Sequence, residues 1–522
     1  MKPNDIECWH YGIYGVIQDL SLLAVILNYC ASGCIPRGAF FVRILLLMGA
    51  RRMKGGFILF NFGGIVVVIK MCLNFLFMNH QGVNKKRRVV VVGAGFAGLN
   101  FVKHIDKRYF EVIVIDRHNY HSFPPLFYQV ASAGLDPASI CFPLRRELRK
   151  LKSKDVRYHM GEVKRIDVAC KKVYTKEEAV EYDILVVAAG TTNNFFNMPE
   201  LEKTVHTLKS TPEALRCRND ILDLLERAAL EKNQDVQRRM LSFVVVGGGP
   251  TGVEIAGAIG EMKRYVLPRE YPSIPQDNMT ITLVEGSGRL LGVMSDKASE
   301  KAIEGLKSLM VNVSLGVSMS SYNDKTVVLS DGSRIPASLV IWTAGVTGRH
   351  FEIDGAATNP IGRGNRFKTD GFCRVEGMDD VYALGDIAIM QNVDDAFPDG
   401  HPQLAQVAIQ QGRLVAKNLN SEVVAMERGG KTVVPDVFIY QDKGAMATIG
   451  RNRAVVDMKH GHLSGFGAWL AWMFVHLISL LGMRNKITVM VNWIWAYFNY
   501  STSLRLLIHP CRYPLRTRWF DD

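Results

Sequence analysis

A short apolar run, Val89–Val92, leads directly into three closely spaced glycines. The three are Gly93, Gly95 and Gly98. In the pattern G-x-G-x-x-G the first glycine allows a tight turn, the second lets the backbone approach a pyrophosphate, and the third lets a helix pack on the strand. A second apolar run, Val112–Ile115, ends in Asp116, whose carboxylate can accept hydrogen bonds from ribose hydroxyls. Together these residues predict a dinucleotide site, with a glycine-rich turn between ordinary strands as the alternative.

The same pattern occurs again near the middle of the chain, after the apolar run Phe243–Val246. The glycines of this second unit are Gly247, Gly249 and Gly252. A further strand, Thr280–Val284, ends in Glu285, and a loop-like insertion at 269–278 separates this acid from its glycines. Two such units predict two nucleotides, one held tightly and one exchanged. A carboxylate at Glu285 would repel a 2′-phosphate, which favours NADH over NADPH, although the nearby Arg289 keeps NADPH open.

Three other stretches have small residues where a strand is expected to end. Tyr182–Gly190 and Leu339–Gly345 are apolar runs that finish in Ala-Gly, and Asp380–Ala388 contains a Gly-Asp pair. Small residues at a strand end let the backbone approach a ligand closely. The alternative for Tyr182–Gly190 is an ordinary strand and turn, and a Gly-Asp pair by itself is common in proteins.

The segment Arg117–Arg145 contains a turn rich in proline and aromatic residues, a short helical run and a polar loop. It closely resembles the corresponding segment of the bacterial type II NADH dehydrogenases, which are single-chain, FAD-containing NADH:quinone oxidoreductases. The resemblance extends through Lys86–Leu507 with several independent motifs. It implies that FAD binds the first glycine unit and NADH the second, that hydride passes from NADH to FAD, and that two electrons then reach a membrane quinone, menaquinone or ubiquinone.

The resemblance and the glycine motifs together predict the residues that bind the two nucleotides. In chain order these are Gly93, Gly95, Phe96, Ala97, Gly98, Asp116, Arg117, Ala189, Gly190, Thr191, Gly247, Gly249, Thr251, Gly252, Glu254, Glu285, Ala344, Gly345, Gly385, Asp386, Gln403, Ala405 and Gln406. Leu339–Gly345 is expected on the flavin side, where the chain returns from the NADH unit. Asp386 is implied to accept hydrogen bonds from ribityl hydroxyls.

Four residues are implied to act in catalysis: Glu254, Gln406, Gln410 and Lys443. The family's matching glutamate lies near nicotinamide and flavin, whereas the alternative for Glu254 is capping of a helix. Gln406 and Gln410 match the family pattern AQxxxQQG and share one helix face, so their amides can donate to a quinone carbonyl. The alternative is a polar face bonded to backbone. Lys443 matches a family lysine that lies near flavin and quinone. The alternative is an exposed lysine in a hairpin.

Composition limits the class of protein and its partners. The chain has 522 residues, a net charge of +13 and nine cysteines. The charge suggests an anionic partner, but no nucleic-acid reader motif is present, and basic residues flank apolar segments at both ends, which favours an anionic membrane surface. The cysteines lack any CxxC or metal-ligand spacing, so we expect reduced thiols and no metal site.

Three rival functions are weighed against quinone reduction by NADH. A disulfide reductase would need a CxxxxC pair after the first glycine unit, and Phe96–Tyr120 contains no cysteine. A sulfide:quinone oxidoreductase would need redox cysteines near the flavin, and neither Cys141 nor Cys373 stands in such a motif. A flavoprotein that binds a partner according to its redox state remains the alternative from another class.

Apolar segments lie at both ends of the chain. Phe57–Phe77 is long enough to span a bilayer, so residues 1–82 are either a membrane extension or upstream sequence before a natural start at Met78. Leu463–Met483 and the aromatic-rich Ile487–Tyr500 are interrupted by cations, which is typical of the membrane interface. The family is monotopic on the cytoplasmic face of the inner membrane, and a homodimer is expected, with a dimer face as the alternative use of this surface.

We therefore expect an α/β protein with two Rossmann-like dinucleotide-binding domains, the two-dinucleotide-binding flavoprotein fold, and a C-terminal membrane-associated helical region. The predicted divisions are 1–82 for the extension, 83–200 with 336–460 for FAD, 201–335 for NADH and 461–522 for the membrane region. The predicted activity does not pump protons, because no set of spans with intramembrane acids accompanies these domains.

Overall fold

The structure is a computed structural model, which describes residues 86–428, 433–459, 461–499 and 504–507. The predictions for residues 1–82, including the apolar segment Phe57–Phe77 and the start at Met78, lie outside these residues. Within the described part of the chain, no helix combines the length and the hydropathy that a membrane crossing needs.

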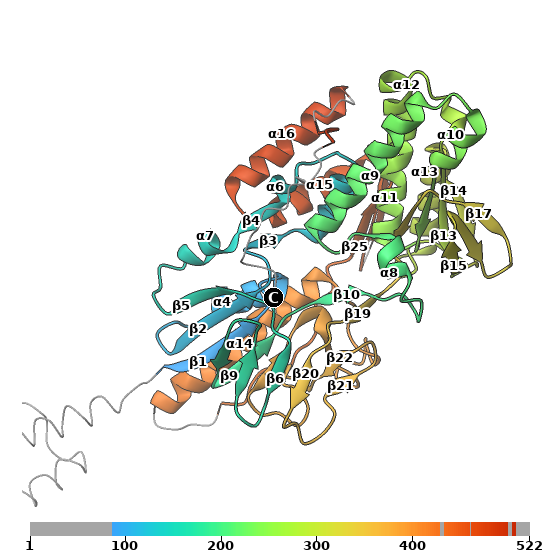
Figure 1. Cartoon of the computed structure of the whole chain (residues 1–522). Coiled ribbons are helices and arrows are strands. Elements are labelled where there is room, and N and C mark those ends of the chain that lie inside the picture. The colour runs from blue at the N-terminus through green and yellow to red at the C-terminus, as the bar shows by residue number, and fades with distance from the viewer. Residues whose placement is uncertain (1–85, 429–432, 460, 500–503, 508–522) are drawn as a thin grey trace, which may run out of the picture. The chain divides into compact units, whose positions relative to one another are not determined.

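The first large sheet has the strand order β23-β9-β1-β2-β5, and every pairing in it is parallel. Its strands are β1 (Arg87–Val92), β2 (Phe110–Asp116), β5 (Val156–Met160), β9 (Ile184–Val187) and β23 (Val381–Ala383). Runs of Val and Ile form these strands because a parallel sheet buries both faces, which suits β-branched side chains without polar alternation. Helices α4 (Phe96–His104) and α14 (Ala405–Glu427) pack together beside this sheet (Figure 1).

The second large sheet repeats this design with the order β11-β18-β12-β13-β14. Its strands are β11 (His206–Thr207), β12 (Ser242–Val246), β13 (Thr280–Glu285), β14 (Asn312–Leu315) and β18 (Leu339–Trp342). The predicted α/β fold with two Rossmann-like units is thus confirmed. One assignment was wrong: β18 pairs in parallel with β12, so the strand expected on the flavin side belongs to the second unit. Its sequence, an apolar run ending in small residues, suits either sheet, and only the pairing decides.

A third sheet, antiparallel, joins the C-terminal helices to the second unit. It consists of β25 (Ala445–Thr448), β26 (Ala454–Met458) and β27 (Gly461–Gly465), followed by α15 (Phe466–Ser479) and α16 (Met483–Asn499). Asp457 accepts hydrogen bonds from the backbone amide and the hydroxyl of Ser295, which precedes α13 (Asp296–Ser308). The division predicted between residues 460 and 461 was wrong, because it cuts the β26–β27 hairpin.

The remaining elements are short or cover the two units. The helices are α5 (Phe127–Ala131), α6 (Pro137–Ile140), α7 (Leu144–Arg149), α8 (Leu201–Thr204), α9 (Thr211–Leu230), α10 (Gln234–Met240), α11 (Pro250–Glu261), α12 (Leu267–Glu270), the π-helical η2 (Met262–Val266) and the 3-10 turns η1 (Pro124–Leu126), η3 (Gln276–Asn278) and η4 (Gly385–Ile387). The strands are β3 (Tyr120–Ser122), β4 (Cys141–Pro143), β6 (Arg165–Asp167), β7 (Lys172–Tyr174), β8 (Ala179–Glu181), β10 (Thr191–Asn193), β15 (Met319–Asn323), β16 (Thr326–Leu329), β17 (Arg334–Pro336), β19 (Val346–Gly348), β20 (Glu352–Asp354), β21 (Ile361–Gly362), β22 (Arg366–Lys368) and β24 (Ala388–Ile389).

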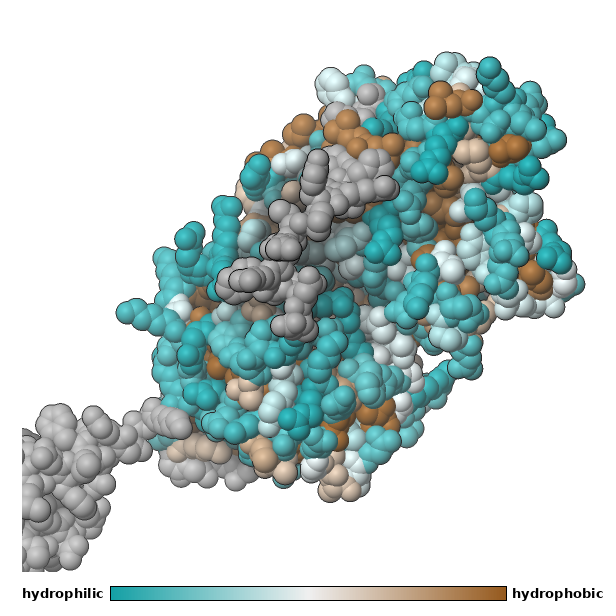
Figure 2. Space-filling view, in the orientation of Figure 1, coloured by the Kyte–Doolittle hydropathy of each residue, from teal (hydrophilic) through white to brown (hydrophobic). Residues whose placement is uncertain are grey.

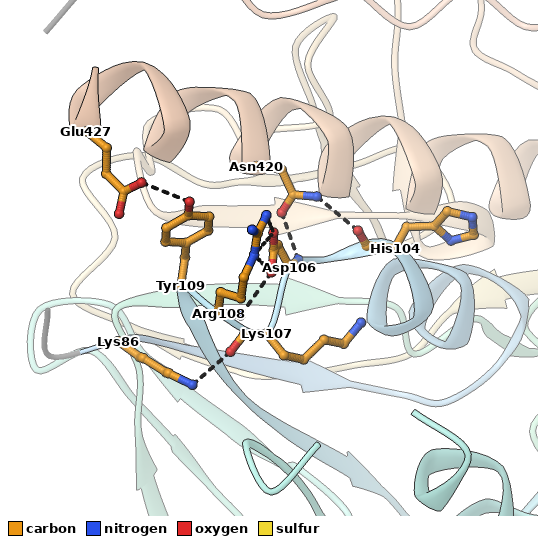
Figure 3. Close-up of polar contacts among 8 residues, drawn as sticks. All are labelled: Lys86, His104, Asp106, Lys107, Arg108, Tyr109, Asn420 and Glu427. Carbon is orange, nitrogen blue, oxygen red and sulfur yellow. Dashed lines mark hydrogen bonds and ion pairs between the residues drawn. The ribbon is translucent and has the colours of Figure 1, made fainter. Parts of the chain in front are cut away.

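Helices α4 and α14 are held together at both ends. Near the start of α14, a Cβ added to Gly412 would overlap the carbonyl oxygen of Ala97 in α4, so the two backbones touch. At the other end, Asn420 donates to the last carbonyl of α4, at His104, and accepts from the amide of Asp106, at 2.9 and 2.8 Å (Figure 3). The Tyr109 hydroxyl donates to Glu427 at 2.8 Å. Asn420 thereby satisfies a helix-end carbonyl that has no partner within its own helix.

The contact at Gly412 gives a stability prediction. Gly412→Ala should force α4 and α14 apart and lower the free energy of unfolding by about 1–3 kcal/mol, the usual cost of overpacking. Gly467→Ala is the control, because a Cβ there would have no neighbour closer than 3.9 Å. Urea unfolding of both variants and the parent measures the difference. Equal midpoints for the two variants would contradict the close helix contact.

Candidate functional site

Both glycine turns have the geometry that a pyrophosphate requires. Gly93 and Gly247 have φ values of 100° and 108°, which non-glycine residues rarely adopt. A Cβ on Gly95 or Gly249 would have no protein atom within 4 Å, so the second glycine of each unit faces open space. A Cβ on the third glycines would overlap the carbonyl of the first glycine in the same unit; these are Gly98 and Gly252. Each turn is therefore a cradle at a helix N-terminus, where backbone amides and the helix dipole favour an anion.

The acids at the ends of the second strands are bound in the same way in both units. Asp116 accepts from the amides of Ala94 and His118 at 2.7 and 2.8 Å. Glu285 accepts from the amides of Gly248 and Ser287 at 2.5 and 2.7 Å. Each carboxylate thus ties the glycine turn to its own strand end. A carboxylate has about four acceptor positions, so each acid retains capacity for ribose hydroxyls.

A half-buried group of charged residues lies at the carboxyl ends of β9 and β23. Lys209 donates to the Thr191 hydroxyl at 2.9 Å. Burial raises the pKa of Asp386, and the charges of Lys209 and Arg366 oppose that rise. The buried Nε of Arg366 has no partner among the described residues, and a Cβ on Gly190 would meet open space. The free Nε of Arg366, the Asp386 carboxylate and the open space beside Gly190 fit the hydroxyls and phosphates of FAD.

Helix α14 positions the Gly-Asp turn of this group. The amide of Gly385, at φ 71°, donates to the buried Gln411 side chain at 2.7 Å, and Gln403 donates to the carbonyl of Asp386 at 3.1 Å. Gln403 was predicted, whereas Gln411 was missed although it stands within the AQxxxQQG pattern. Lys209 and Arg366 were also missed, because no motif surrounds them in the sequence.

The structure places some of the other predicted residues away from the position expected from the sequence. Ala344 lies against Gly247, so Ala344 and Gly345 follow β18 in the second unit and not on the flavin side, as expected from the sequence. Arg349, another residue that the sequence did not indicate, donates to the carbonyl of Ala189 at 3.1 Å. Arg117 and Thr251 are exposed.

Glu254 is buried between the second unit and the C-terminal sheet. Burial raises its pKa to about 8, and the Thr448 amide and the Trp472 indole oppose the rise. The Thr448 amide of β25 donates to its carboxyl group at 3.4 Å. Because α11 begins at Pro250, Glu254 is past the first helical turn, and the capping alternative was wrong. The carboxyl group is therefore largely protonated at neutral pH.

A hydrogen-bonded chain of polar side chains leads from Thr448, whose amide bonds Glu254, to α16. The Tyr128 hydroxyl bonds the Thr448 hydroxyl at 3.0 Å and accepts from Gln129 at 2.9 Å, and Trp493 of α16 donates to Gln129 at 2.8 Å. A cavity of about 140 Å³ is bordered by these residues and by Trp472. These contacts bring α5, β25, α15 and α16 together beside Glu254.

Gln406 and Gln410 both bind the chain segment that precedes β25. Gln406 donates to the carbonyl of Gly444 at 2.8 Å and accepts from the amide of Lys443 at 3.2 Å. Gln410 donates to the carbonyl of Gln441 at 2.9 Å and accepts from its amide at 3.0 Å. Both side-chain amides are therefore bonded to backbone, which was the alternative considered from the sequence. It does not exclude quinone binding, because each amide nitrogen carries a second hydrogen. The side chain of Lys443 is exposed.

The cysteines named in the rival functions do not form a redox pair in the described residues. Both Cys141 and Cys373 are free thiols. Burial raises the pKa of Cys373, which disfavours the reactive thiolate. Cys141 contacts the Thr211 hydroxyl at 3.2 Å, and burial raises its pKa as well.

The position of Lys209 gives a prediction for cofactor retention. Lys209→Met should weaken FAD binding about tenfold to a hundredfold, because it removes a charged donor from a buried site. FAD absorbance that remains with the protein after dilution and gel filtration measures the loss, with the exposed Lys297→Met as control. Equal retention in both variants would contradict a place for Lys209 in the cofactor site.

Comparison with known proteins places the chain among flavin-dependent reductases. Residues 87–412 match the family model described as pyridine nucleotide-disulphide oxidoreductase, and residues 443–499 match the NDH2 C-terminal domain. The fold is similar to that of NDH2 from Plasmodium falciparum in complex with NADH, with a TM-score of 0.74 and 21% identity over 81% of this chain and 100% of that one. The sulfide:quinone oxidoreductase of Aquifex aeolicus is similar with a TM-score of 0.59 and 17% identity over 81% of this chain and 96% of that one.

Sequence relatives narrow the family further. The chain is 33% identical to the type II NADH:quinone oxidoreductase Ndh of Mycobacterium tuberculosis, over 80% of this chain and 89% of the relative. It is 35% identical to the mitochondrial external alternative NAD(P)H-ubiquinone oxidoreductase B2 of Arabidopsis thaliana, over 60% and 57% of the two chains. Because the first of these relatives is 33% identical over most of both chains, and the C-terminal residues match the NDH2 domain, the chain belongs to the type II NADH:quinone oxidoreductases.

Proposed function

We propose that this protein oxidises NADH and reduces a membrane quinone, menaquinone or ubiquinone, without pumping protons. The observation that carries the proposal is the pair of cradles at Gly95 and Gly249 at the carboxyl ends of two parallel sheets. When bound, FAD supplies the two-electron chemistry that links NADH oxidation to quinone reduction. The protein supplies the position of each partner and the protons.

The proposed site residues divide into those that hold nucleotides and those that serve the quinone side. The first cradle, with Asp116 and the group around Asp386, would hold FAD, and the second cradle with Glu285 would hold NADH. Reduction of a quinone to a quinol by NADH consumes one proton from solvent, and Glu254 can carry that proton at neutral pH. Gln406 and Gln410 would orient the quinone with their second amide hydrogens, and Lys443 would lie at the entrance.

The proposal includes peripheral association with the cytoplasmic face of the inner membrane. Helices α15 and α16 support it, because both expose large apolar side chains, among them Phe474 at 65% and Phe498 at 74%. Burial of each such side chain contributes roughly 1.5–3 kcal/mol. Part of this surface would also serve a homodimer. The proposed domains are an FAD unit, an NADH unit that includes β18, and a C-terminal unit that starts before β25.

Quinone-dependent turnover tests the function directly. Protein loaded with FAD should oxidise NADH in a steady state only when a soluble short-chain quinone is present, and NADPH should be used less well because Glu285 repels a 2′-phosphate. Absorbance at the NADH band follows the reaction. If quinone did not stimulate turnover, a flavoprotein that binds a partner according to its redox state would be the better description.

The pKa of Glu254 gives a pH prediction. Since the neutral acid prevails below about pH 8, quinone-dependent turnover should fall as the pH rises through that value. Glu254→Gln should lower turnover at neutral pH by up to about 100-fold, since it removes an acid, and should abolish the titration near pH 8. An unchanged pH profile in the variant would exclude Glu254 as the proton carrier.

Stability measurements show whether that variant is folded. In the folded protein Glu254 keeps a proton that the unfolded chain releases above its ordinary pKa of 4.5, so this group makes unfolding easier as the pH rises from 4.5 to about 8. Glu254→Gln should remove that contribution. Melting temperatures across this range should therefore fall less steeply in the variant than in the parent.

A further inference from the structure

The segment that contains α7 carries an unusual concentration of exposed cations. Those on the surface are Arg145, Arg146, Arg149, Lys150, Lys152 and Lys154. The acid in this run, Glu147, is turned inward, where it binds Lys103 of α4 at 2.7 Å and also Lys150. None of the other five cations forms an ion pair with a described residue. The segment therefore presents a positively charged surface that can attract an anionic partner.

This basic segment is linked to the start of α16 through β4. Phe142 of β4 lies beneath the cations, with the Lys150 nitrogen 4.6 Å and the Arg146 guanidinium carbon 5.6 Å from its ring centre. On its other side, a Cβ added to Gly482 would overlap the ring of Phe142. Asn485 of α16 donates to the carbonyl of Cys141 at 2.9 Å. The cations are thus fixed to the turn between α15 and α16.

The C-terminal helices expose large apolar side chains in addition to those that they bury. On α16 the exposed apolar residues recur at helical spacing, at Met483, Ile487, Met490, Val491, Ile494, Trp495 and Phe498. A similar stripe on α15 consists of Phe466, Leu470, Phe474, Val475 and Ile478. Both helices turn a buried tryptophan inward, and the rings of Trp472 and Trp493 lie 5.6 Å apart, so the apolar stripes face outward. Apolar side chains are visible over α16 in Figure 2.

We propose that α7 and the residues that follow it bind anionic phospholipid headgroups, while the stripes of α15 and α16 enter the adjacent acyl region. The inference rests on the membrane association proposed above and adds the lipid chemistry and the residues that recognise it. Charge complementarity indicates that an anionic bilayer covers this surface, because its phosphates can meet the cations and its acyl chains can meet the apolar stripes. Arg484, exposed at the start of α16, extends the basic border.

Vesicle binding by the full chain with FAD tests the proposal. The parent protein should bind vesicles of phosphatidylcholine with phosphatidylglycerol more tightly than vesicles of phosphatidylcholine alone. Removal of two cations with the double variant Arg146→Gln and Arg149→Gln should weaken binding to the anionic vesicles about 25-fold, or roughly fivefold per charge, and leave binding to neutral vesicles unchanged. High salt should cancel the preference for anionic vesicles without releasing the protein, whereas detergent should release it.

The double variant Lys297→Gln and Lys307→Gln is the matched control. It removes the same charge from exposed positions of α13 and should leave both affinities unchanged. Equal loss in the two double variants, or no loss in either, would overturn the role of α7. A face covered by a second copy would also overturn it, and would appear as a stable dimer that binds neither kind of vesicle. Turnover with a soluble quinone in detergent should be the same in all variants. If the parent protein showed no such turnover, the proposed function would be refuted, but the proposed lipid binding would not.

Discussion

Close approach of backbone to backbone is the constraint on which this structure depends. Gly93 and Gly247 turn the chain at φ values that other residues avoid, and Gly98 and Gly252 let each helix touch its own turn. Gly412 in the same way lets the backbones of α4 and α14 touch. The second glycine of each turn, Gly95 or Gly249, instead faces open space. In each turn the first and third glycines therefore serve the protein's own packing, and the second leaves room for a phosphate group.

The two units are chemically alike but differ in what surrounds them. Both tie an acid to the amide that follows the first glycine. The first unit is then completed by half-buried charges, at Lys209, Arg366 and Asp386, which suits a ligand that stays bound. The second unit is completed instead by β25 and the C-terminal helices, which bury Glu254 and raise its pKa. This difference in surroundings suits one retained nucleotide and one that exchanges.

Helix α14 and the C-terminal sheet connect the nucleotide units to the surface. At one end of α14, Gln406 bonds the segment before β25 and Gln403, which precedes the helix, bonds the Gly-Asp turn; the other end is fixed to α4 through Asn420. Aromatic contacts continue outward, since Phe96 of α4 lies 5.8 Å from Phe123, which lies 6.0 Å from His476 of α15. Burial lowers the pKa of His476 to about 4, so this ring is neutral at physiological pH. The surface helices are therefore packed directly against the elements that would hold the flavin.

The sequence by itself determined the two glycine turns, their strands and their terminal acids, because tight turns and buried parallel strands depend on residue types that are close together in the chain. It also indicated Glu254, Gln406 and Gln410, although not their partners. Only the tertiary structure decided that β18 joins the second sheet, since an apolar run ending in small residues fits either one. It also decided that Thr448 meets Glu254 across 194 residues and that Lys209 and Arg366 flank Asp386. Such contacts depend on how whole elements pack, and no local spacing records them.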